Sequence, residues 1–235
     1  MSRPLIVKTG ETLPEIQPVR GDFEDWIAAG MGLERSEVGV VRVHRGEALP
    51  DPALADCIVV TGSSSMVTDR EDWSERTAAW LRRVVEADTP LLGICYGHQL
   101  LAHALGGQVA DNPNGREVGT VEIELEEAAR TDPLLSAVAP GERLHATHVQ
   151  SVLRLPDGAR NLARTRLDPC HAFAVGERVF GVQSHPEFDA DVMRRYLTVR
   201  RQRIASEVLD VDALLAAVEE TPAGPRLLRR FAALR

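Results

Sequence analysis

A cysteine between two glycines is the first feature of the sequence that suggests chemistry. Cys95 stands in Gly93-Ile94-Cys95-Tyr96-Gly97-His98-Gln99, a G-x-C-x-G pattern like the turn that presents the nucleophile in G-x-S-x-G enzymes. That turn is strained, and the residues two before and two after the nucleophile must be small. The amino end of a following helix would favour a thiolate. The pattern predicts a nucleophilic Cys95, although a buried structural cysteine beside packing glycines would have the same sequence.

A histidine and a glutamate two residues apart could serve this nucleophile. They lie in Gln183-Ser184-His185-Pro186-Glu187-Phe188, after a segment with the pattern of a strand. His185 can present its imidazole to a thiol while the Glu187 carboxylate holds the other ring nitrogen. Taken alone, the same residues would also fit a histidine that faces solvent in a loop.

Together these segments resemble the class I glutamine amidotransferases, and within them the glutaminase domain of GMP synthase and its stand-alone relatives. The matching segments are Gly93 to Gln99, Gly115-Arg116-Glu117-Val118-Gly119 and Val182 to Phe188. The resemblance implies a flavodoxin-like fold and a thioester mechanism. In that mechanism Cys95 attacks a side-chain carboxamide, His185 protonates the departing ammonia, Glu187 orients His185, and water releases glutamate.

The resemblance also implies further site residues. It places the two backbone N–H donors of an oxyanion hole at Tyr96 and in the loop Thr61-Gly62-Ser63-Ser64, where we assign the donor to Ser63. Gly62 and Gln99 are the expected substrate-binding residues. The chain departs from many relatives at Gly62-Ser63-Ser64, where they have Gly-Gly-Pro. It also departs at His148-Val149-Gln150, where they often have His-x-Asp, and at Ser184, where they often have an aromatic residue.

Three functions are compatible with these residues. The leading hypothesis is hydrolysis of the γ-glutamyl amide of glutamine, with ammonia passed to a partner synthase. The alternative is hydrolysis of γ-glutamyl peptides or conjugates, and a third, less favoured, is a non-catalytic regulatory module. The sequence has no Walker loop and no S-G-G-x-D-S pattern of the ATP pyrophosphatase domain, so this chain is not expected to make GMP alone. No local metal-ligand spacing occurs, and we expect neither a metal nor a cofactor.

The elements that must position these residues alternate as in a parallel α/β sheet. Short apolar runs predict strands at Pro4 to Thr9, Val38 to His44, Asp56 to Thr61 and Pro90 to Cys95, the last two buried on both faces. Helical periodicity marks Asp22 to Gly30, Ser74 to Ala87 and Gly97 to Leu105. The expected fold is a flavodoxin-like three-layer sandwich with a mostly parallel central sheet and additional antiparallel strands.

The second half of the chain supplies the antiparallel strands and a helical end. Val118 to Leu125 alternates like a half-exposed strand, and Cys170 to Gln183 resembles a hairpin that turns at Gly176-Glu177-Arg178. After Asp189 the chain is predicted to be helical, with Val211 to Glu220 and Pro225 to Leu234 separated by a breaker at Thr221 to Gly224. We expect a single domain over residues 1–235, with a C-terminal helical extension from about 201–235.

Composition limits the partners and the compartment. The net charge of −8 gives no electrostatic reason to bind nucleic acid or an anionic membrane. The local cluster Arg194, Arg195, Arg200, Arg201 and Arg203 fits the wet side of a helix. Three cysteines form no even disulfide set, and Cys57 lies in an apolar strand with no nearby base. Cys170 precedes His171, but adjacent side chains on a strand point to opposite faces, so we expect no ligand role for it. Without a signal-peptide core or a long apolar run, a cytoplasmic location is expected.

Overall fold

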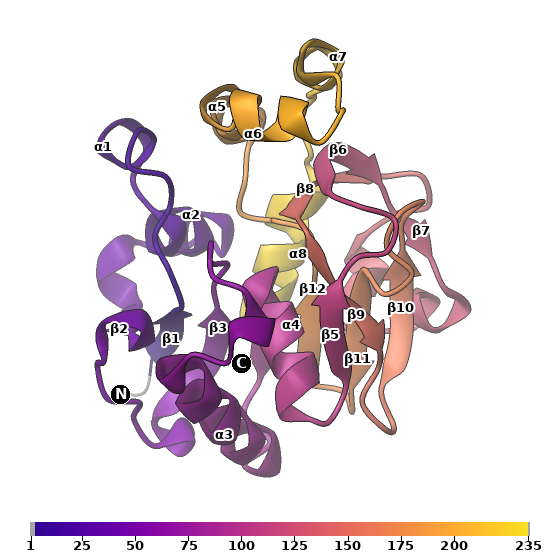
Figure 1. Cartoon of the computed structure of the whole chain (residues 1–235). Helices are drawn as coiled ribbons and strands as arrows, with labels where there is room; N and C mark the ends of the chain where they lie inside the picture. The colour runs from indigo at the N-terminus through magenta and orange to yellow at the C-terminus, as the bar shows by residue number, and fades with distance from the viewer. Residues whose placement is uncertain (1–2, 235) are drawn as a thin grey trace.

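The central sheet is built from eight strands, which the computed structural model places within residues 3–234, the part of the chain that it describes (Figure 1). These strands are β1 (Arg3–Lys8), β2 (Gly39–Arg42), β3 (Ala55–Val60), β4 (Leu91–Ile94), β7 (Glu124–Leu125), β10 (Arg160–Arg164), β11 (Ala172–Val175) and β12 (Val179–Val182). Their order across the sheet is β2-β1-β3-β4-β12-β11-β10-β7. Neighbours from β2 to β12 are parallel, and those from β12 to β7 are antiparallel. The predicted α/β fold with a mixed, mostly parallel sheet is confirmed.

Helices cover both faces of this sheet and complete the three layers. They are α1 (Gln17–Arg20), α2 (Phe23–Gly30), α3 (Asp72–Glu86), α4 (Tyr96–Ala104), α5 (Ala190–Val199), α6 (Arg201–Ser206), α7 (Val211–Ala216) and α8 (Ala223–Ala232). The predicted helices at 22–30, 74–87 and 97–105 correspond to α2, α3 and α4. None of the helices in the described residues is both long and apolar enough to cross a membrane.

Two hydrophobic cores follow from the alternation of side chains along the central strands. In β3, Cys57 and Val59 face the core that contains α2 and α8, whereas Ile58 and Val60 face the core that contains α3 and α4. Successive side chains of a strand point to opposite faces, so a strand covered on both sides must be apolar throughout. This burial explains the continuous apolar runs in the sequence.

Two antiparallel pairs lie beside the sheet and hold part of the site. They are formed by β5 (Gln108–Asp111) with β9 (Gln150–Arg154), and by β6 (Glu117–Glu122) with β8 (Arg143–His148). The single strand predicted over 118–125 is therefore wrong in extent. Ile123 donates the last hydrogen bond on the β8 side, to Glu142 O at 2.9 Å, and the chain then pairs as β7 with β10.

The C-terminal helices separate into two groups. In Figure 1, α5, α6 and α7 lie together at the top, while α8 runs behind the sheet and packs on α2 with Leu227, Leu228 and Phe231 fully buried. The predicted helix 211–220 ends at Ala216, and the predicted breaker 221–224 extends too far, because α8 begins at Ala223. Gly224 instead allows a close approach between α8 and Pro186, since a Cβ at this position would lie 2.4 Å from Pro186 O.

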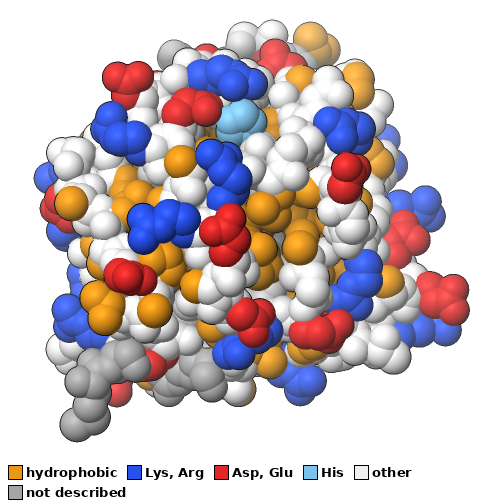
Figure 2. All heavy atoms as spheres, turned by 90° about the horizontal axis from the view of Figure 1, so that it is seen from below, with side chains coloured by type: hydrophobic (Ala, Val, Ile, Leu, Met, Phe, Trp, Pro, Cys, Tyr) orange, Lys and Arg blue, Asp and Glu red, His pale blue; other side chains and the backbone are white. Residues whose placement is uncertain are grey.

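Charged side chains of both signs are mixed with apolar ones on the face seen in Figure 2. The net charge of −8 is thus not gathered into a patch of one sign on this face. Mixed charge of this kind gives no long-range field that would steer a strongly charged macromolecule to this face.

Candidate active site

Cys95 occupies a strained turn between β4 and α4. Its backbone dihedrals are φ 51° and ψ −101°, a combination that a residue with a side chain rarely adopts. The two flanking glycines make the turn possible. A Cβ at Gly93 would lie 2.5 Å from Gly97 O, and one at Gly97 would lie 2.4 Å from Val60 O. The backbone thus has the sharp turn that the G-x-C-x-G pattern predicts, and the thiol stands at the amino end of α4.

His185 follows β12, the strand that pairs with β4, and is held from several sides. Its Nδ1 lies 2.8 Å from Glu187 Oε1, and its backbone N–H donates to His145 O at 2.7 Å. The ring stacks on Phe188 at a centroid distance of 4.2 Å. With Nδ1 engaged by the carboxylate, Nε2 is the nitrogen left for proton transfer. Cys95 and His185 line one small cavity, so the fold brings the predicted pair together across 90 residues of chain.

The charges around this pair favour an ionised thiol. Burial alone would raise the pKa of Cys95, but the neighbouring positive charges of His185 and then of His148 outweigh burial and lower that pKa. Burial alone would lower the pKa of His185, but the carboxylate of Glu187 and the thiolate of Cys95 raise it well above its usual value. The arrangement therefore favours a thiolate beside an imidazolium.

The loop that follows β3 passes close to both side chains. A Cβ on Gly62 would lie 2.9 Å from His185 Cε1, so only glycine fits here without moving the ring. The Gly62 carbonyl oxygen accepts hydrogen bonds from the hydroxyls of Thr9 and Thr61, each at 3.0 Å. In a trans peptide the following N–H points the opposite way. These two threonines therefore fix the direction of the Ser63 N–H, the expected oxyanion donor.

Gln99 and Tyr96 have partners that the sequence did not reveal. The Gln99 amide nitrogen donates to Gln150 O at 2.8 Å and to Gln183 Oε1 at 3.0 Å, so both of its hydrogens are engaged. Its oxygen remains the atom that can meet a substrate. The Tyr96 hydroxyl lies 2.6 Å from the Ser74 hydroxyl on α3. That contact turns the Tyr96 side chain toward α3. The role expected of Tyr96 in the oxyanion hole therefore falls to its backbone N–H alone.

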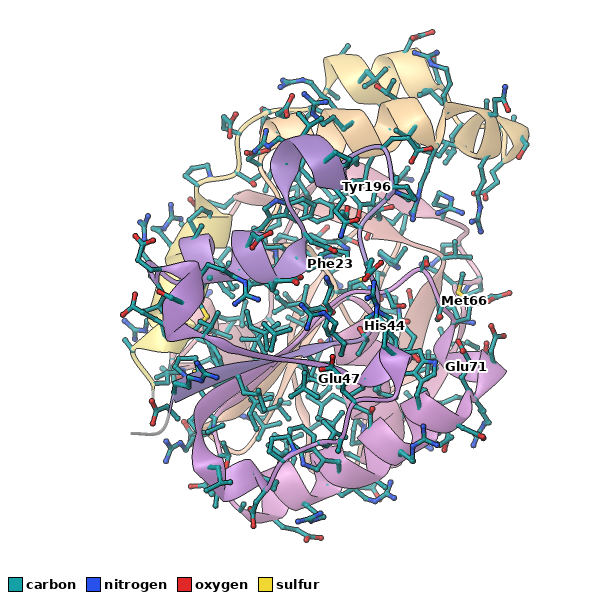
Figure 3. All side chains as sticks on the ribbon, turned by 90° about the vertical axis from the view of Figure 1, so that its left-hand side faces the viewer. Phe23, His44, Glu47, Met66, Glu71 and Tyr196 are labelled. Atoms are coloured by element: carbon teal, nitrogen blue, oxygen red, sulfur yellow. The ribbon has the colours of Figure 1, made fainter. Side chains whose placement is uncertain are left out.

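A second small cavity also borders Cys95. Its volume is about 50 Å³, and its lining includes Ser63, Gln99, His148, Arg116 and Arg200. Gly62 is not part of this lining. The helices after Asp189 cover this side, and Figure 3 shows Tyr196 of α5 above Phe23. The predicted site residues thus lie around one thiol, with a polar and partly cationic cavity next to it.

Arg200 is a site residue that the sequence analysis missed. The arginine cluster of which it is part was interpreted as a solvated face, but Arg200 is half-buried and lines both cavities beside Cys95. Its guanidinium lies 5.2 Å from the centre of the Tyr196 ring and donates to Thr147 Oγ1 at 3.4 Å. No carboxylate of the described residues forms an ion pair with it. An available cation in a cavity beside the nucleophile favours an anionic ligand.

Four buried residues form a cluster with metal-ligand chemistry that local sequence spacing did not indicate. Glu117, His148, Asp168 and His171 each offer one ligand atom, and these atoms lie within 4.8 Å of one another. Burial would raise the pKa of Asp168, but the neighbouring His171 and His148 lower it to about 2. Two of the four residues lie in the matching segment 115–119 and in segment 148–150, where the chain departs from many relatives. Only the fold brings in the other two, from the loop between β10 and β11.

The chain matches a family model described as glutamine amidotransferase class-I over residues 22–200. A GMP synthase [glutamine-hydrolyzing] from Aeropyrum pernix is 38% identical over 165 residues, which cover 70% of this chain and 28% of that protein. The chain thus spans under a third of that relative. Gamma-glutamyl peptidase 4 from Arabidopsis thaliana is 28% identical over 178 residues, which cover 74% of this chain and 70% of the peptidase.

A solved structure of a glutamine amidotransferase from Thermotoga maritima has the same overall arrangement. Its TM-score is 0.77, and the alignment covers 98% of this chain and 96% of that one at 20% sequence identity. At this identity the likeness concerns the fold. The sheet and helices described above are therefore those of known glutamine amidotransferases.

Proposed function

We propose that this chain, which belongs to the class I glutamine amidotransferase family, uses Cys95 to hydrolyse a γ-glutamyl amide bond. The observation that carries the proposal is the strained Cys95 at the start of α4, in one cavity with a His185 whose Nδ1 is held by Glu187 at 2.8 Å. A nucleophile, a base and a residue that orients the base are the parts that covalent amide hydrolysis needs.

The reaction proceeds in two halves. The Cys95 thiolate attacks the amide carbon and forms a C–S bond, while the carbonyl electrons move onto oxygen. His185 gives its proton to the amide nitrogen, the C–N bond breaks, and ammonia or an amine leaves. Water then attacks the thioester and loses a proton to His185. The C–S bond breaks, glutamate leaves, and the thiolate beside a protonated His185 is restored.

The negative oxygen of each tetrahedral intermediate needs two donors. The backbone N–H of Tyr96, at the amino end of α4, supplies one. The second comes from Ser63, whose peptide is oriented through the Gly62 carbonyl by Thr9 and Thr61. In this scheme the side chain of Ser63 has no part in the chemistry. The replacement of Gly-Gly-Pro by Gly62-Ser63-Ser64 is then compatible with an intact oxyanion hole.

Arg200 is the group that we assign to the α-carboxylate of the glutamyl substrate. It lines the cavity with Gln99 and Cys95 and lacks a carboxylate partner among residues 3–234. A γ-glutamyl compound has a free α-carboxylate at the end remote from the amide that is cleaved. Pairing that carboxylate with Arg200 would place the amide toward the thiol. Every γ-glutamyl substrate shares this end, so Arg200 does not select the leaving group.

Two leaving groups are compatible with the site, ammonia from glutamine and the amine of a γ-glutamyl peptide or conjugate. One observation favours keeping the second candidate. The relative named Gamma-glutamyl peptidase 4 matches this chain over 70% of its own length, whereas the match covers only 28% of the GMP synthase. For glutamine, a synthase partner that receives ammonia is part of the proposal.

A glutamate-release assay over glutamine and a panel of γ-glutamyl peptides and conjugates tests the function. We expect turnover of at least one substrate, and its complete loss in Cys95→Ala. Cys57→Ala and Cys170→Ala are matched controls, because both replace buried cysteines on other strands or loops. An electrophilic glutamine analogue, such as a chloroketone, should label Cys95 once. Normal turnover by Cys95→Ala would refute the mechanism.

A further inference from the structure

We propose that Glu117, His148, Asp168 and His171 form a binding site for one divalent transition-metal ion, with Zn²⁺ as the best fit. The four side chains come from β6, the end of β8 and the loop that joins β10 to β11. All four are buried, with exposed fractions of 3%, 4%, 0% and 1%. His148 also lines the cavity of Cys95, but none of the four residues transfers a proton or forms a bond in the proposed hydrolysis.

The distances between the ligand atoms suit tetrahedral coordination. His148 Nε2 lies 3.0 Å from Glu117 Oε2 and 3.9 Å from Asp168 Oδ2. His171 Nδ1 lies 3.4 Å and 3.6 Å from the same two oxygens. Metal–ligand bonds of about 2.0–2.1 Å give tetrahedral edges of about 3.3 Å. The four measured edges bracket this value, so an ion would need only small adjustments of the side chains.

Hydrogen bonds outside the cluster leave the required atoms free for an ion. His148 Nδ1 lies 2.9 Å from Gln150 O. A carbonyl can only accept, so Nδ1 must carry the proton. Nε2 then faces Glu117 Oε2 at 3.0 Å, a contact in which a metal ion would replace a proton. An N–H bonded to a carbonyl is the usual outer contact of a metal-binding histidine.

Three further atoms of the cluster residues lack hydrogen bonds although they are buried. Asp168 Oδ2, His171 Nδ1 and His171 Nε2 have no hydrogen-bond partner. Leaving such groups unsatisfied in the interior is costly, and native proteins seldom do so. The other oxygens are engaged: Thr165 donates to Glu117 Oε1 at 2.6 Å, and the Cys170 N–H donates to Asp168 Oδ1 at 3.1 Å. Two of the unsatisfied atoms, Asp168 Oδ2 and His171 Nδ1, thus lie at the common centre, 3.6 Å from each other.

The donor set identifies the class of ion. Two imidazole nitrogens and two carboxylate oxygens match Zn²⁺, which prefers four ligands of these types. Two carboxylates and two neutral imidazoles also carry a summed charge that a divalent cation balances. Ca²⁺ and Mg²⁺ need six or more ligands, mostly oxygen, and fit poorly. The ion would fasten β6 and β8 to the loop before β11, so we expect it to stabilise the fold beside the active site.

Zinc binding by the folded protein is the direct test. It is best done with Cys95→Ala, because the active-site thiolate is itself a metal ligand. After chelation and buffer exchange, calorimetric titration with Zn²⁺ should give one equivalent per chain. Zinc at about 100 times its Kd should raise Tm by roughly 5–10 °C. Co²⁺ in place of Zn²⁺ should give the strong visible bands of a four-coordinate site without thiolate charge-transfer bands, which excludes Cys170 as a ligand.

Variants assign the ligands. Asp168→Asn and His171→Gln, each in the Cys95→Ala protein, should weaken Zn²⁺ binding by about 100-fold or more. His103→Gln is the matched control, because this histidine meets Glu75 at 3.0 Å away from the cluster and its loss should leave binding unchanged. Equal binding by all three variants would overturn the site. The site would also be overturned if the folded, metal-free Cys95→Ala protein bound no zinc and gave no cobalt spectrum. This second test does not depend on whether the ligand variants fold.

Discussion

The proposed chemistry depends on how one carboxylate sets the charge of one imidazole. Glu187 Oε1 lies 2.8 Å from His185 Nδ1, and after burial, which acts in the opposite direction, its charge is the largest influence on the pKa of His185. Because its pKa is raised, His185 stays protonated at pH values above 6.5, the ordinary pKa of a histidine. Because its pKa is lowered, Cys95 is present as a thiolate at pH values below 9.0, the ordinary pKa of a cysteine. Activity should therefore extend over the interval in which both ionised forms coexist.

Glu187→Gln tests this coupling. The amide keeps the shape but loses the charge, so the pKa of His185 should fall and the alkaline limb of kcat/KM should move to lower pH. We expect kcat/KM at its optimum to fall by about 100-fold or more, the contribution of general acid–base catalysis. The measurement is kcat/KM between about pH 5 and 10. An alkaline limb that stays where it is in the native protein would contradict the proposed role of Glu187.

Thr9 is a positioning residue for the oxyanion hole. Its hydroxyl bonds to Thr61 O at 2.8 Å and to Gly62 O at 3.0 Å. Thr9→Val removes these bonds at nearly constant volume and frees the Ser63 peptide to turn. Loss of an oxyanion donor costs about 100 to 1000-fold in kcat, and a loosened donor should cost roughly tenfold, with KM little changed. Thr77→Val is the control, because its buried hydroxyl bonds within α3 to Trp73 O. A similar kcat for both variants would count against the assignment.

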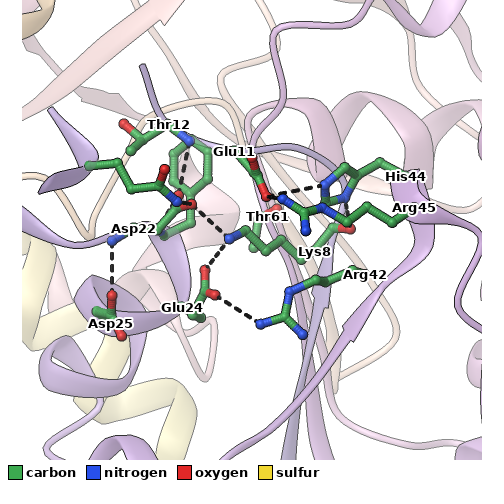
Figure 4. Close-up of polar contacts among 12 residues, drawn as sticks. Lys8, Glu11, Thr12, Asp22, Glu24, Asp25, Arg42, His44, Arg45 and Thr61 are labelled. Atoms are coloured by element: carbon green, nitrogen blue, oxygen red, sulfur yellow. Dashed lines mark hydrogen bonds and ion pairs between the residues drawn. The ribbon is translucent and has the colours of Figure 1, made fainter. Parts of the chain in front are cut away.

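At the scale of elements, a buried lysine holds the amino end of α2 to β1. Lys8 is 2% exposed and pairs with Asp22 and Glu24, each at 2.7 Å (Figure 4). Asp22 also caps α2 and accepts the Thr12 N–H at 2.9 Å. One ammonium thus fixes a strand, a helix start and the loop between them. Phe23, at the start of α2, lies beside His185, so this network also positions the active site.

Lys8→Met should destabilise the protein by about 3–5 kcal/mol. The buried carboxylate of Asp22 would lose its cation, and Glu24 would keep only Arg42 among the described residues, at 3.7 Å. Urea unfolding measures the change. Arg45→Met is the matched control, since Arg45 pairs with Glu11 at the surface, where an ion pair is worth about 0–1 kcal/mol. Equal losses in the two variants would show that burial of Lys8 is unimportant.

The junction of α5 and α6 is expected to act in substrate binding. Arg200 stands there and lines both cavities beside Cys95. Arg200→Met keeps much of the length but removes the charge, and we expect KM to rise about 10 to 100-fold with kcat within a few-fold, because a lost carboxylate contact of roughly 1.5–3 kcal/mol weakens binding alone. Arg201→Met is the control, since this neighbour pairs with Asp212 instead. A fall in kcat with unchanged KM would exclude the assignment.

At the scale of the whole molecule, the question is whether free glutamine is a sufficient substrate. The cavity beside Cys95 has a volume of only about 50 Å³ and is covered by the helices after Asp189. A synthase partner or a larger γ-glutamyl substrate could move these helices or the Gly62-Ser63-Ser64 loop. Such a movement would change both the access of substrate to Cys95 and the geometry of the oxyanion hole. The prediction of one domain with a helical extension from about residue 201 stays a prediction.

We expect the purified chain to hydrolyse free glutamine slowly. The measurement is kcat/KM for glutamine on the isolated protein, compared with the best γ-glutamyl compound of the panel. A value below about 10⁴ M⁻¹s⁻¹, the lower edge for efficient enzymes, is expected for glutamine. A higher value would mean that neither a partner nor another substrate is needed.

The sequence alone determined the features that depend on neighbours along the chain. The turn at Cys95 could be predicted because its constraint spans only Gly93 to Gly97, and the His185 and Glu187 pair because the two residues are separated by one proline. Strands such as β3 and helices such as α3 follow from periods of two and 3.6 residues. The family follows from the same local segments, and the match over residues 22–200 confirms it.

Tertiary structure decided what depends on which strands become neighbours. The order β4-β12 puts His185 beside Cys95, and the pairing of β6 with β8 brings Glu117 to His148. The junction of α5 and α6 brings Arg200 to Thr147 of β8. The pairing of β7 with β10 divides the strand predicted over 118–125. Side chains far apart in sequence meet only after the backbone has paired and packed. Their contacts therefore reflect the free energy of the whole fold, which no local pattern encodes.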